Sequence, residues 1–308
     1  MRKKIISFYF SVLIGSFSGY LFAQNLTGAV NQYNKKNFKA AEFQSTVKKI
    51  RMKDLFAWCI IPYDSKERTP EERIEMLKQL GFTSYAYDWR EKHLDGTGHE
   101  LRLAKDNGIN IIAVWMWIDK DEPDKLSESN EKILSALEET GTSTQIWLGF
   151  NENYFNGLKQ EESIQKGVEM LRYLDGRAKE SGSRIALYNH GGWFGEPENQ
   201  VQMIKQLSDS KIGIIYNFHH GHEQIDRFPE ILKIMKPYLW AVNLNGMKKK
   251  GPKIITIGKG NEEEDMIRLV LKSGFDGPFG IIGHTEGEDV KEVLQRNLEG
   301  LRNLGFLL

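Results

Sequence analysis

The sequence predicts an α/β protein built as a single (β/α)8 TIM barrel, and two observations predict it. Eight short apolar runs rich in Ile, Val and aromatic residues recur between residues 55 and 284, separated by charged segments with helical patterns. Near-continuous apolar runs of this kind are typical of parallel strands that are buried on both faces. The eight units occupy about 250 residues, which is the usual size of such a barrel.

The predicted strands are residues 55–61, 82–88, 109–117, 144–150, 184–190, 211–219, 239–245 and 279–284. The segments between them are predicted to be helices. The helix expected at 70–81 has Thr69 as its cap, Pro70 in its first turn and Gly81 at its end. Acidic residues lead the helices expected at 161–182 and 262–274. The last helix, expected at 288–305, carries an apolar stripe that Asn297 interrupts.

The alternative architecture is an open, doubly wound sheet. Such a sheet normally has a glycine-rich, phosphate-binding turn after its first strand. Here Pro62-Tyr63-Asp64 follows the first apolar run. The closed barrel is therefore favoured, with neither a linker nor a second domain.

The N-terminus predicts export. Arg2, Lys3 and Lys4 precede an apolar stretch that ends at Ala23, the pattern of a signal peptide. The alternative is a membrane anchor, but small residues dilute the apolar run. We expect a signal peptide at 1–23, a leader at 24–53 and the barrel at 54–308. The mature protein is then periplasmic or secreted, without stable membrane insertion.

Composition excludes several classes of protein. There are 42 Lys and Arg against 42 Asp and Glu, so the basic excess of a nucleic-acid-binding protein is missing. A hydrophobic content of 40% argues against a disordered chain. The single cysteine, Cys59, excludes an internal disulfide and a thiolate cluster. Its place in the first apolar run predicts a buried apolar role.

Histidines gather at the predicted C-terminal ends of the strands, where barrels of this class carry their active sites. Five of the seven lie there: His190, His219, His220, His222 and His284. Imidazole is a metal ligand and also an acid/base group near neutral pH. Imidazoles from neighbouring strands, joined by a carboxylate, suit Zn, Mn, Co or Fe. The alternative is that some of these rings only bond to loop backbone.

Tryptophans and amides supply the second signal. Trp115 and Trp117 share one face of the third predicted strand, and Trp193 follows the fifth. Flat apolar rings beside hydrogen-bonding groups suit a sugar, which has C–H faces and hydroxyl edges. We expect these rings to stack on a sugar, and Asn217 and Asn245 to bind its hydroxyl groups.

The segment after the seventh predicted strand suggests a second class of ligand, a phosphate group. Lys248, Lys249 and Lys250 precede Ile257-Gly258-Lys259-Gly260, which itself precedes a helix. A helix N-terminus with nearby lysines suits a phosphate. A solvated loop is an equally good interpretation.

Three segments carry a resemblance to a known family: NHGG after the fifth strand, NFHHGH after the sixth, and GIIGHTEGEDVKEVLQRNLEGL at the end. Over residues 54–308 the chain resembles the xylose-isomerase-like TIM barrels, also called sugar phosphate isomerases/epimerases, with endonuclease IV as a relative. The last segment resembles an exported bacterial branch. The resemblance implies a divalent metal held by a Glu, an Asp, a His and a final Glu, with two carboxylates that move a proton next to a sugar carbonyl.

This chain departs from that metal-binding pattern. Tyr188 stands where the resemblance implies the first Glu, and Asn217 where it implies the Asp. Asn243 and Asn245 stand where a His is expected, and His284 lies near the place of the final Glu. The remaining candidates for ligands of a divalent ion (Mn, Zn, Co or Fe) are His190, His219, His284 and Glu152. The acid/base candidates are His220, His222 and Glu286. Which histidine of the sixth strand end faces the barrel is left open, because one bulge would change it.

The resemblance and the residues together lead to a functional hypothesis. We expect a metal-dependent enzyme that removes a proton next to the carbonyl of a keto-sugar, with lyase or hydratase chemistry on sugars derived from 3-keto-glycosides. The alternatives are a sugar isomerase or epimerase, and a barrel that only binds sugar. A phosphodiesterase or endonuclease role is disfavoured by neutral charge and predicted export. The partner is a small carbohydrate rather than a nucleic acid.

Overall fold

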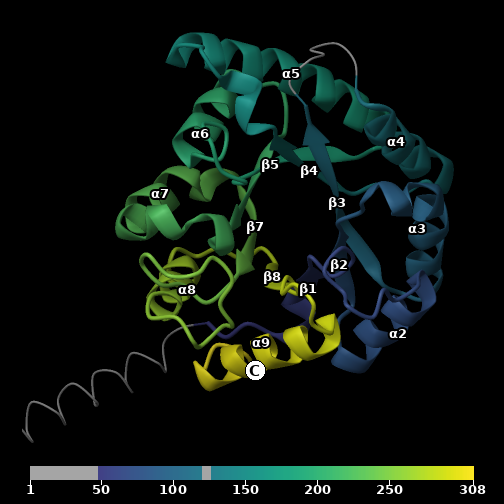
Figure 1. Cartoon of the computed structure of the whole chain (residues 1–308). Helices are drawn as coiled ribbons and strands as arrows, with labels where there is room; N and C mark the ends of the chain where they lie inside the picture. The colour runs from purple at the N-terminus through teal and green to yellow at the C-terminus, as the bar shows by residue number, and fades with distance from the viewer. Residues whose placement is uncertain (1–47, 120–125) are drawn as a thin grey trace, which may run out of the picture. The chain divides into compact units, whose positions relative to one another are not determined.

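A computed structural model describes residues 48–119 and 126–308, and within them eight parallel strands close into a barrel in the order β1 to β8. Helices between the strands form an outer ring around the barrel (Figure 1). The predicted fold class is therefore confirmed. The expected signal peptide and residues 24–47 of the expected leader lie outside the described residues.

All eight predicted strands are present, although most are shorter than their apolar runs. They are β1 (Leu55–Trp58), β2 (Ser84–Tyr87), β3 (Asn110–Ile118), β4 (Gln145–Phe150), β5 (Arg184–Tyr188), β6 (Gly213–Asn217), β7 (Leu239–Leu244) and β8 (Phe279–Ile282). The residues beyond several strand ends turn into the loops at the C-terminal end of the barrel instead of extending the sheet.

The described helices are α2 (Pro70–Leu80), α3 (Thr97–Asp106), α4 (Glu128–Thr140), α5 (Gln160–Glu180), α6 (Pro197–Lys205), α7 (Phe228–Met235), α8 (Glu263–Lys272) and α9 (Val290–Asn303). The capping residues predicted for the first of these helices are confirmed in α2, where the Thr69 side chain accepts a hydrogen bond from the Glu72 N–H. Gly81 ends this helix with a φ of 81°, a left-handed conformation that glycine adopts without strain.

Short 3-10 turns follow several strands and redirect the chain over the barrel. Three of them carry residues of the predicted site: η3 (Glu152–Phe155), η4 (Phe218–His220) and η5 (His222–Arg227). In η4, the Asn217 side chain accepts a hydrogen bond from the His219 N–H and so fixes the turn directly after β6. These turns decide which loop residues face the cavity.

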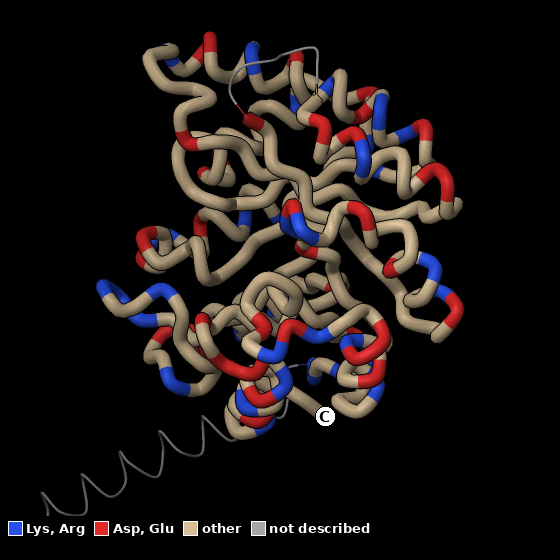
Figure 2. Tube along the Cα trace, turned by 45° about the vertical axis from the view of Figure 1, so that its right-hand side comes forward, with Lys and Arg blue, Asp and Glu red and all other residues tan. Residues whose placement is uncertain are grey.

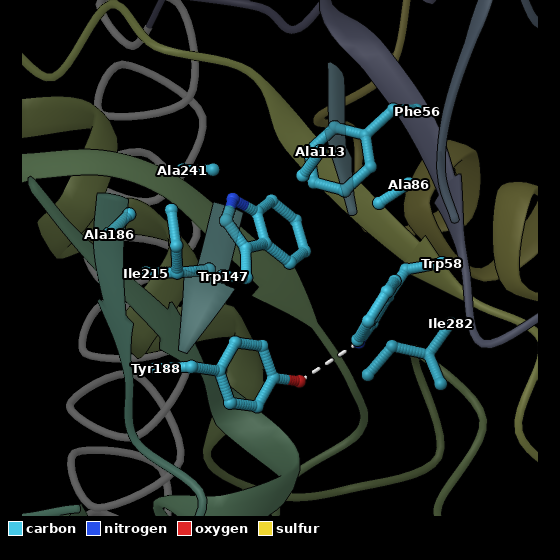
Figure 3. Packing of buried hydrophobic residues seen from close by; sticks show 10 residues of the cluster. All are labelled: Phe56, Trp58, Ala86, Ala113, Trp147, Ala186, Tyr188, Ile215, Ala241 and Ile282. Carbon is cyan, nitrogen blue, oxygen red and sulfur yellow. Dashed lines mark hydrogen bonds between the residues drawn. The ribbon is translucent and has the colours of Figure 1, made fainter. Parts of the chain in front are cut away.

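The barrel interior is filled by large aromatic rings beside alanines, as Figure 3 shows. Trp147 lies at its centre, with ring centroids 5.6 Å from Phe56 and 5.0 Å from Trp58. Small side chains from four other strands belong to the same cluster: Ala86, Ala113, Ala186 and Ala241. This pairing of large and small side chains fills the interior, so the barrel is a packed core and not a pore.

The two ends of the described barrel meet. β1 pairs with β8 in the register Leu55↔Phe279 to Trp58↔Ile282. Ile50 forms a parallel bridge with Leu307, where Ile50 N–H donates to the Phe306 carbonyl at 2.8 Å. The last residues of the expected leader therefore tie the C-terminus to the start of the barrel.

Charge is spread over the outer helices, where basic and acidic residues are interspersed (Figure 2). Many form local pairs, such as Arg177 with Glu131 at 2.8 Å. Within residues 48–119 and 126–308, no helix is long and apolar enough to cross a membrane.

Candidate active site

A cavity of about 480 Å³ opens at the C-terminal ends of the strands. Its lining comes from the ends of β1, β2, β3, β5, β6 and β8 and the residues after them. The principal lining residues are Trp58, Cys59, Tyr63, Asp88, Trp89, Arg90, Trp115, Trp117, Tyr188, His190, Asn217, His219, His220 and His284. The cavity thus lies where this class of barrel places its active site.

One side of the cavity is a tryptophan wall, formed by Trp58, Trp89, Trp115 and Trp117. The rings of Trp115 and Trp117 stack with centroids 6.0 Å apart, since alternate residues of β3 share a face. They fit because β4 has Gly149 beneath them, where a Cβ atom would come within 2.6 Å of Trp115 and 2.7 Å of Trp117. The glycine therefore makes room for this part of the wall.

A histidine cluster, formed by His190, His219, His220 and His284, adjoins this wall, and the His190 ring centroid lies 4.9 Å from that of Trp117. The ring centroids are 4.4 Å apart for His190 and His220, 4.1 Å for His219 and His220, and 5.4 Å for His219 and His284. Burial lowers the pKa of each ring, and for His219 burial and His284 lower the pKa to about 3. The cluster is therefore uncharged at neutral pH.

Asp88, directly after β2, is a buried carboxyl group in the cavity lining. It is 2% exposed, and neither carboxyl oxygen has a hydrogen-bond partner in the described part of the chain. Removal from water raises its pKa from 3.8 to about 7, against the opposing attraction of Arg90 and Arg73. A carboxyl group with this pKa can both accept and release a proton at neutral pH.

A hydrogen-bonded group at the base of the cavity centres on Tyr188. The Trp58 indole N–H donates to the Tyr188 hydroxyl at 2.9 Å, as Figure 3 shows, and the Asn217 amide donates to the same oxygen. Asn189 joins the ends of β5 and β6, because its oxygen accepts from the Asn217 N–H at 2.7 Å. Burial raises the pKa of Tyr188 well above its usual value, so the hydroxyl keeps its proton.

The loop after β1 contributes two residues that the sequence did not mark as functional. Tyr63 stacks on His284 with ring centroids 3.5 Å apart. Cys59 was expected inside a strand, but β1 ends at Trp58 and Cys59 lines the cavity with a left-handed φ of 56°. Burial raises the pKa of its thiol well above the usual value, so it is an un-ionised thiol.

The structure brings seven of the predicted site residues together in the cavity lining: Trp115, Trp117, His190, Asn217, His219, His220 and His284. The other five, Glu152, Trp193, His222, Asn245 and Glu286, are not part of this lining. Asp88, Arg90, Tyr63 and Tyr188 belong to it although the sequence analysis did not select them. The signal for Asp88 and Arg90 was their position at the end of the second apolar run.

Trp193 packs away from the cavity. Its ring lies 4.5 Å from that of Phe155, and its indole N–H donates to Gln160 at 2.8 Å. The preceding Gly191 and Gly192 both have positive φ angles, 107° and 60°, and turn the chain outward. Trp193 therefore has a packing contact here in place of the expected stacking on sugar.

His222 and Asn245 hold a loop instead of lining the cavity. The two ring nitrogens of His222 lie 3.2 Å from the Lys248 carbonyl and 3.0 Å from the Lys253 carbonyl. The Asn245 amide donates to the same Lys253 carbonyl at 2.8 Å. The remaining two, Glu152 and Glu286, are exposed and affect His190 and His284 only through charge.

The residues present do not fit a divalent metal centre. Across the described ranges, no group of three or more His, Cys, Asp and Glu side chains is arranged to hold a metal ion. The histidine cluster lacks a carboxylate, because Glu152 lies outside it. Tyr188 and Asn217, at positions where the resemblance implies carboxylates, are neutral and bonded to each other. The four expected ligands are therefore not brought together in this structure, and metal binding by the protein stays a prediction.

The loop after β7 is also unlike a phosphate site. The buried carboxylate of Glu263 accepts hydrogen bonds from the N–H groups of Met247, Gly258 and Gly260, at 2.9, 3.0 and 2.8 Å. These are the backbone donors that a phosphate would need. The solvated-loop interpretation is therefore favoured over a phosphate clamp.

Comparison with known proteins places the chain in a family. Residues 74–304 match the family described as xylose isomerase-like TIM barrel, and the chain belongs to it. Among curated protein sequences, none matches significantly.

Solved structures share the fold at low identity. One is 3-keto-D-glucoside 4-epimerase, YcjR, from E. coli, with a TM-score of 0.63 and 16% identity over 82% of this chain and 99% of that one. The IOLI protein with a zinc atom has a TM-score of 0.59 and 12% identity, over 81% and 97%. The probable 3-DHS dehydratase AsbF from Bacillus anthracis has a TM-score of 0.59 and 14% identity, over 80% and 98%.

Proposed function

We propose that the protein is an enzyme that binds a keto-sugar and removes the proton next to its ketone. The single observation that carries this proposal is Asp88, an unpartnered buried carboxyl group in the same cavity as the tryptophan wall. A buried acid/base group of near-neutral pKa in an aromatic cavity marks a reactive site rather than a packing position.

Recognition of the sugar is assigned to the tryptophan wall and the polar groups beside it. The indole faces offer apolar surface to the C–H groups of a sugar ring. The neutral imidazoles can donate or accept hydrogen bonds from its hydroxyl groups. The cavity volume of about 480 Å³ lies in the range of small-ligand sites, and suits a monosaccharide or a small glycoside.

Proton transfer is assigned to Asp88. A ketone makes the neighbouring C–H group acidic, because the charge left by the proton moves to the carbonyl oxygen. The Asp88 carboxylate accepts the proton, and its pKa of about 7 allows it to return or pass on the proton at neutral pH. His190 or His220, 4.4 Å apart, supplies a second neutral proton carrier.

The outcome that we propose is elimination and hydration of a keto-sugar. The family match supports chemistry next to a carbonyl. So do two structural relatives, a keto-glucoside epimerase and a probable dehydratase. Isomerisation or epimerisation shares the removal of the proton, but the proton then returns to the sugar and no β-substituent leaves. Residues 1–23 support export, so we propose a periplasmic or secreted location.

The test is exchange and product analysis in deuterated water. The mature protein is incubated with methyl 3-keto-glucoside and with free ketoses, and the sugars are followed by NMR. We expect deuterium next to the ketone, slowed by two to four orders of magnitude in Asp88→Asn. Asp209→Asn, a change at an exposed loop position, is the control and should keep the wild-type rate.

The products separate the outcomes. An unsaturated or hydrated sugar identifies a lyase or hydratase, whereas a changed stereocentre or a moved carbonyl identifies an epimerase or isomerase. Binding of sugar without exchange at any position would contradict the proposal and identify a sugar-binding barrel.

A further inference from the structure

The Tyr188 hydroxyl has an unusual hydrogen-bond arrangement at the base of the cavity. Its oxygen accepts bonds from the Trp58 indole N–H and the Asn217 amide. The indole N–H and the amide NH2 are donors only, so neither group can take the proton that the hydroxyl carries. The Asn243 side chain lies near this hydroxyl and lowers its pKa, but no described residue accepts a hydrogen bond from the Tyr188 O–H in this arrangement, and Tyr188 lines the cavity. The O–H group is therefore free to donate to a ligand.

The surroundings make this hydroxyl a strong and fixed donor. Two accepted hydrogen bonds polarise the O–H bond and strengthen it as a donor. The ring is held by Trp58, Trp115 and Trp147, at centroid distances of 5.8, 5.0 and 5.9 Å. Tyr188 is 2% exposed, so a bond made there is shielded from water and gains strength.

The neighbouring residues add further groups without partners. Asn243 lies outside the cavity lining but near the Tyr188 hydroxyl, and neither polar atom of its buried side chain has a hydrogen-bond partner among the described residues. Among the same described residues, the His190 Nδ1 atom and both oxygens of Asp88 also lack partners. Buried polar groups are normally paired, so a concentration of unpaired groups around one cavity points to a polar ligand.

We propose that the Tyr188 hydroxyl donates a hydrogen bond to the ketone oxygen of the substrate and stabilises the negative charge that forms there. This inference rests on the proposed function. When Asp88 takes the proton from the neighbouring carbon, the C–H electron pair forms a C=C bond and the C=O pair moves to oxygen. Tyr188 stabilises that enolate oxygen, which a metal ion would otherwise do. Returning a proton to carbon, or losing a β-hydroxyl group as water with a second proton, completes the reaction.

The residues at the implied metal-ligand positions explain why a neutral hydrogen-bond donor can stabilise the enolate. Two of the three positions where the resemblance implies carboxylate ligands hold Tyr188 and Asn217, which bond to one another. A carboxylate beside a developing enolate would repel it unless a cation lay between them. A neutral phenol needs no such cation.

The experiment compares Tyr188→Phe with Tyr216→Phe. Tyr216 is a matched control, a buried tyrosine on the adjacent β6 whose hydroxyl donates to Gln224 at 2.8 Å, outside the cavity lining. Both variants and the wild type are treated with EDTA. Each is then assayed for exchange on methyl 3-keto-glucoside, and for the carbonyl stretching frequency of the bound sugar labelled with ¹³C at the ketone.

We expect EDTA-treated wild type and Tyr216→Phe to keep their rates. Tyr188→Phe should lose about 10²- to 10³-fold in kcat while KM changes by less than about fivefold. The carbonyl band should lie at lower frequency in the wild-type complex than in water, and return upward in Tyr188→Phe. A purely structural tyrosine would not move this band.

Three results would overturn the inference: an unshifted wild-type band, a Tyr188→Phe variant with kcat within threefold of wild type, or an EDTA-inactivated enzyme restored by a divalent ion. If Tyr188→Phe does not fold, the carbonyl band of the wild-type complex by itself tests the inference. A shifted band without exchange on any keto-sugar would refute the proposed function and leave the contact of Tyr188 with the ketone standing.

Discussion

Asp88 shows how position along a strand changes the chemistry of an ordinary side chain. Tyr87 and Asp88 are sequence neighbours at the end of β2. The Tyr87 hydroxyl lies 3.3 Å from Thr97 in α3, under the helix layer, whereas Asp88 lines the cavity. Alternation along a strand sends the two to opposite sides of the barrel wall. The carboxyl group is thereby surrounded by aromatic rings, where its charge is disfavoured.

This burial makes stability depend on pH. Native Asp88 keeps its proton up to about pH 7, whereas an unfolded aspartate loses it near pH 4. As pH rises through this window, only the unfolded state ionises, so the native state loses stability. Between about pH 4.5 and 8, the free energy of unfolding of the wild type should fall by about 3 kcal/mol more than that of Asp88→Asn.

Urea titrations at the two pH values measure this difference. Asp209→Asn is again the control, because Asp209 is exposed, and it should follow the wild type. If Asp88→Asn and wild type had the same pH dependence, Asp88 would not be the group that titrates.

At the scale of elements, β3 and β4 together build the sugar-stacking surface. Trp117 stands on β3 opposite Gly149 of β4 in the strand register. We expect Trp117→Leu to weaken binding of a keto-sugar about 3- to 10-fold, since aromatic contacts contribute about 0.5–1.5 kcal/mol beyond buried area. Isothermal titration calorimetry measures the change in Kd.

Trp240→Leu is the matched control for this prediction. Trp240 lies on β7, where its ring contacts the Arg184 guanidinium at 4.5 Å, and it is absent from the cavity lining. Its variant should bind with wild-type affinity. Equal weakening in both variants would mean that the effect is general destabilisation and not loss of stacking.

The strands could be predicted from the sequence because burial on both faces leaves a continuous apolar run. The path of the loops could not be predicted from the sequence. η4 places His219 and His220 in the cavity, while the next turn carries His222 to the Lys248 and Lys253 carbonyls. A pattern of residue types does not contain these backbone turns. The same limit explains Trp193, which two left-handed glycines direct away from the cavity.

The structural role of a polar residue within an apolar helix stripe could not be predicted from the sequence either. Asn297 interrupts the apolar stripe of α9, yet it is 6% exposed. Its amide donates to the Ile282 carbonyl at the end of β8, and its oxygen accepts from the Ile257 N–H at 2.8 Å. The residue therefore joins α9 to β8 and to the loop after β7. Long-range partners of this kind are separated by many residues in the chain, so local patterning does not reveal them.

For the whole molecule, the barrel and its helix ring are joined by a buried ionic group. The Arg73 guanidinium of α2 donates to Glu100 of α3 at 2.8 Å, and the Tyr85 hydroxyl of β2 donates to the same carboxylate at 2.7 Å. Arg73 and Glu100 are each 3% exposed. Their mutual neutralisation allows two charges to lie between the helices and the sheet.

Glu100→Gln should therefore destabilise the entire fold. The substitution leaves the Arg73 charge buried without its partner, and such a loss costs about 3–5 kcal/mol. Urea unfolding measures it. The control is Glu131→Gln, which removes a pair of similar geometry from the surface, where the Glu131 side chain is 40% exposed and Arg177 is 25% exposed. Solvent screens that pair, so the control should lose no more than about 1 kcal/mol. If the two variants lost equal stability, the helix ring would not depend on the buried pair, and its attachment to the barrel would rest on apolar packing alone.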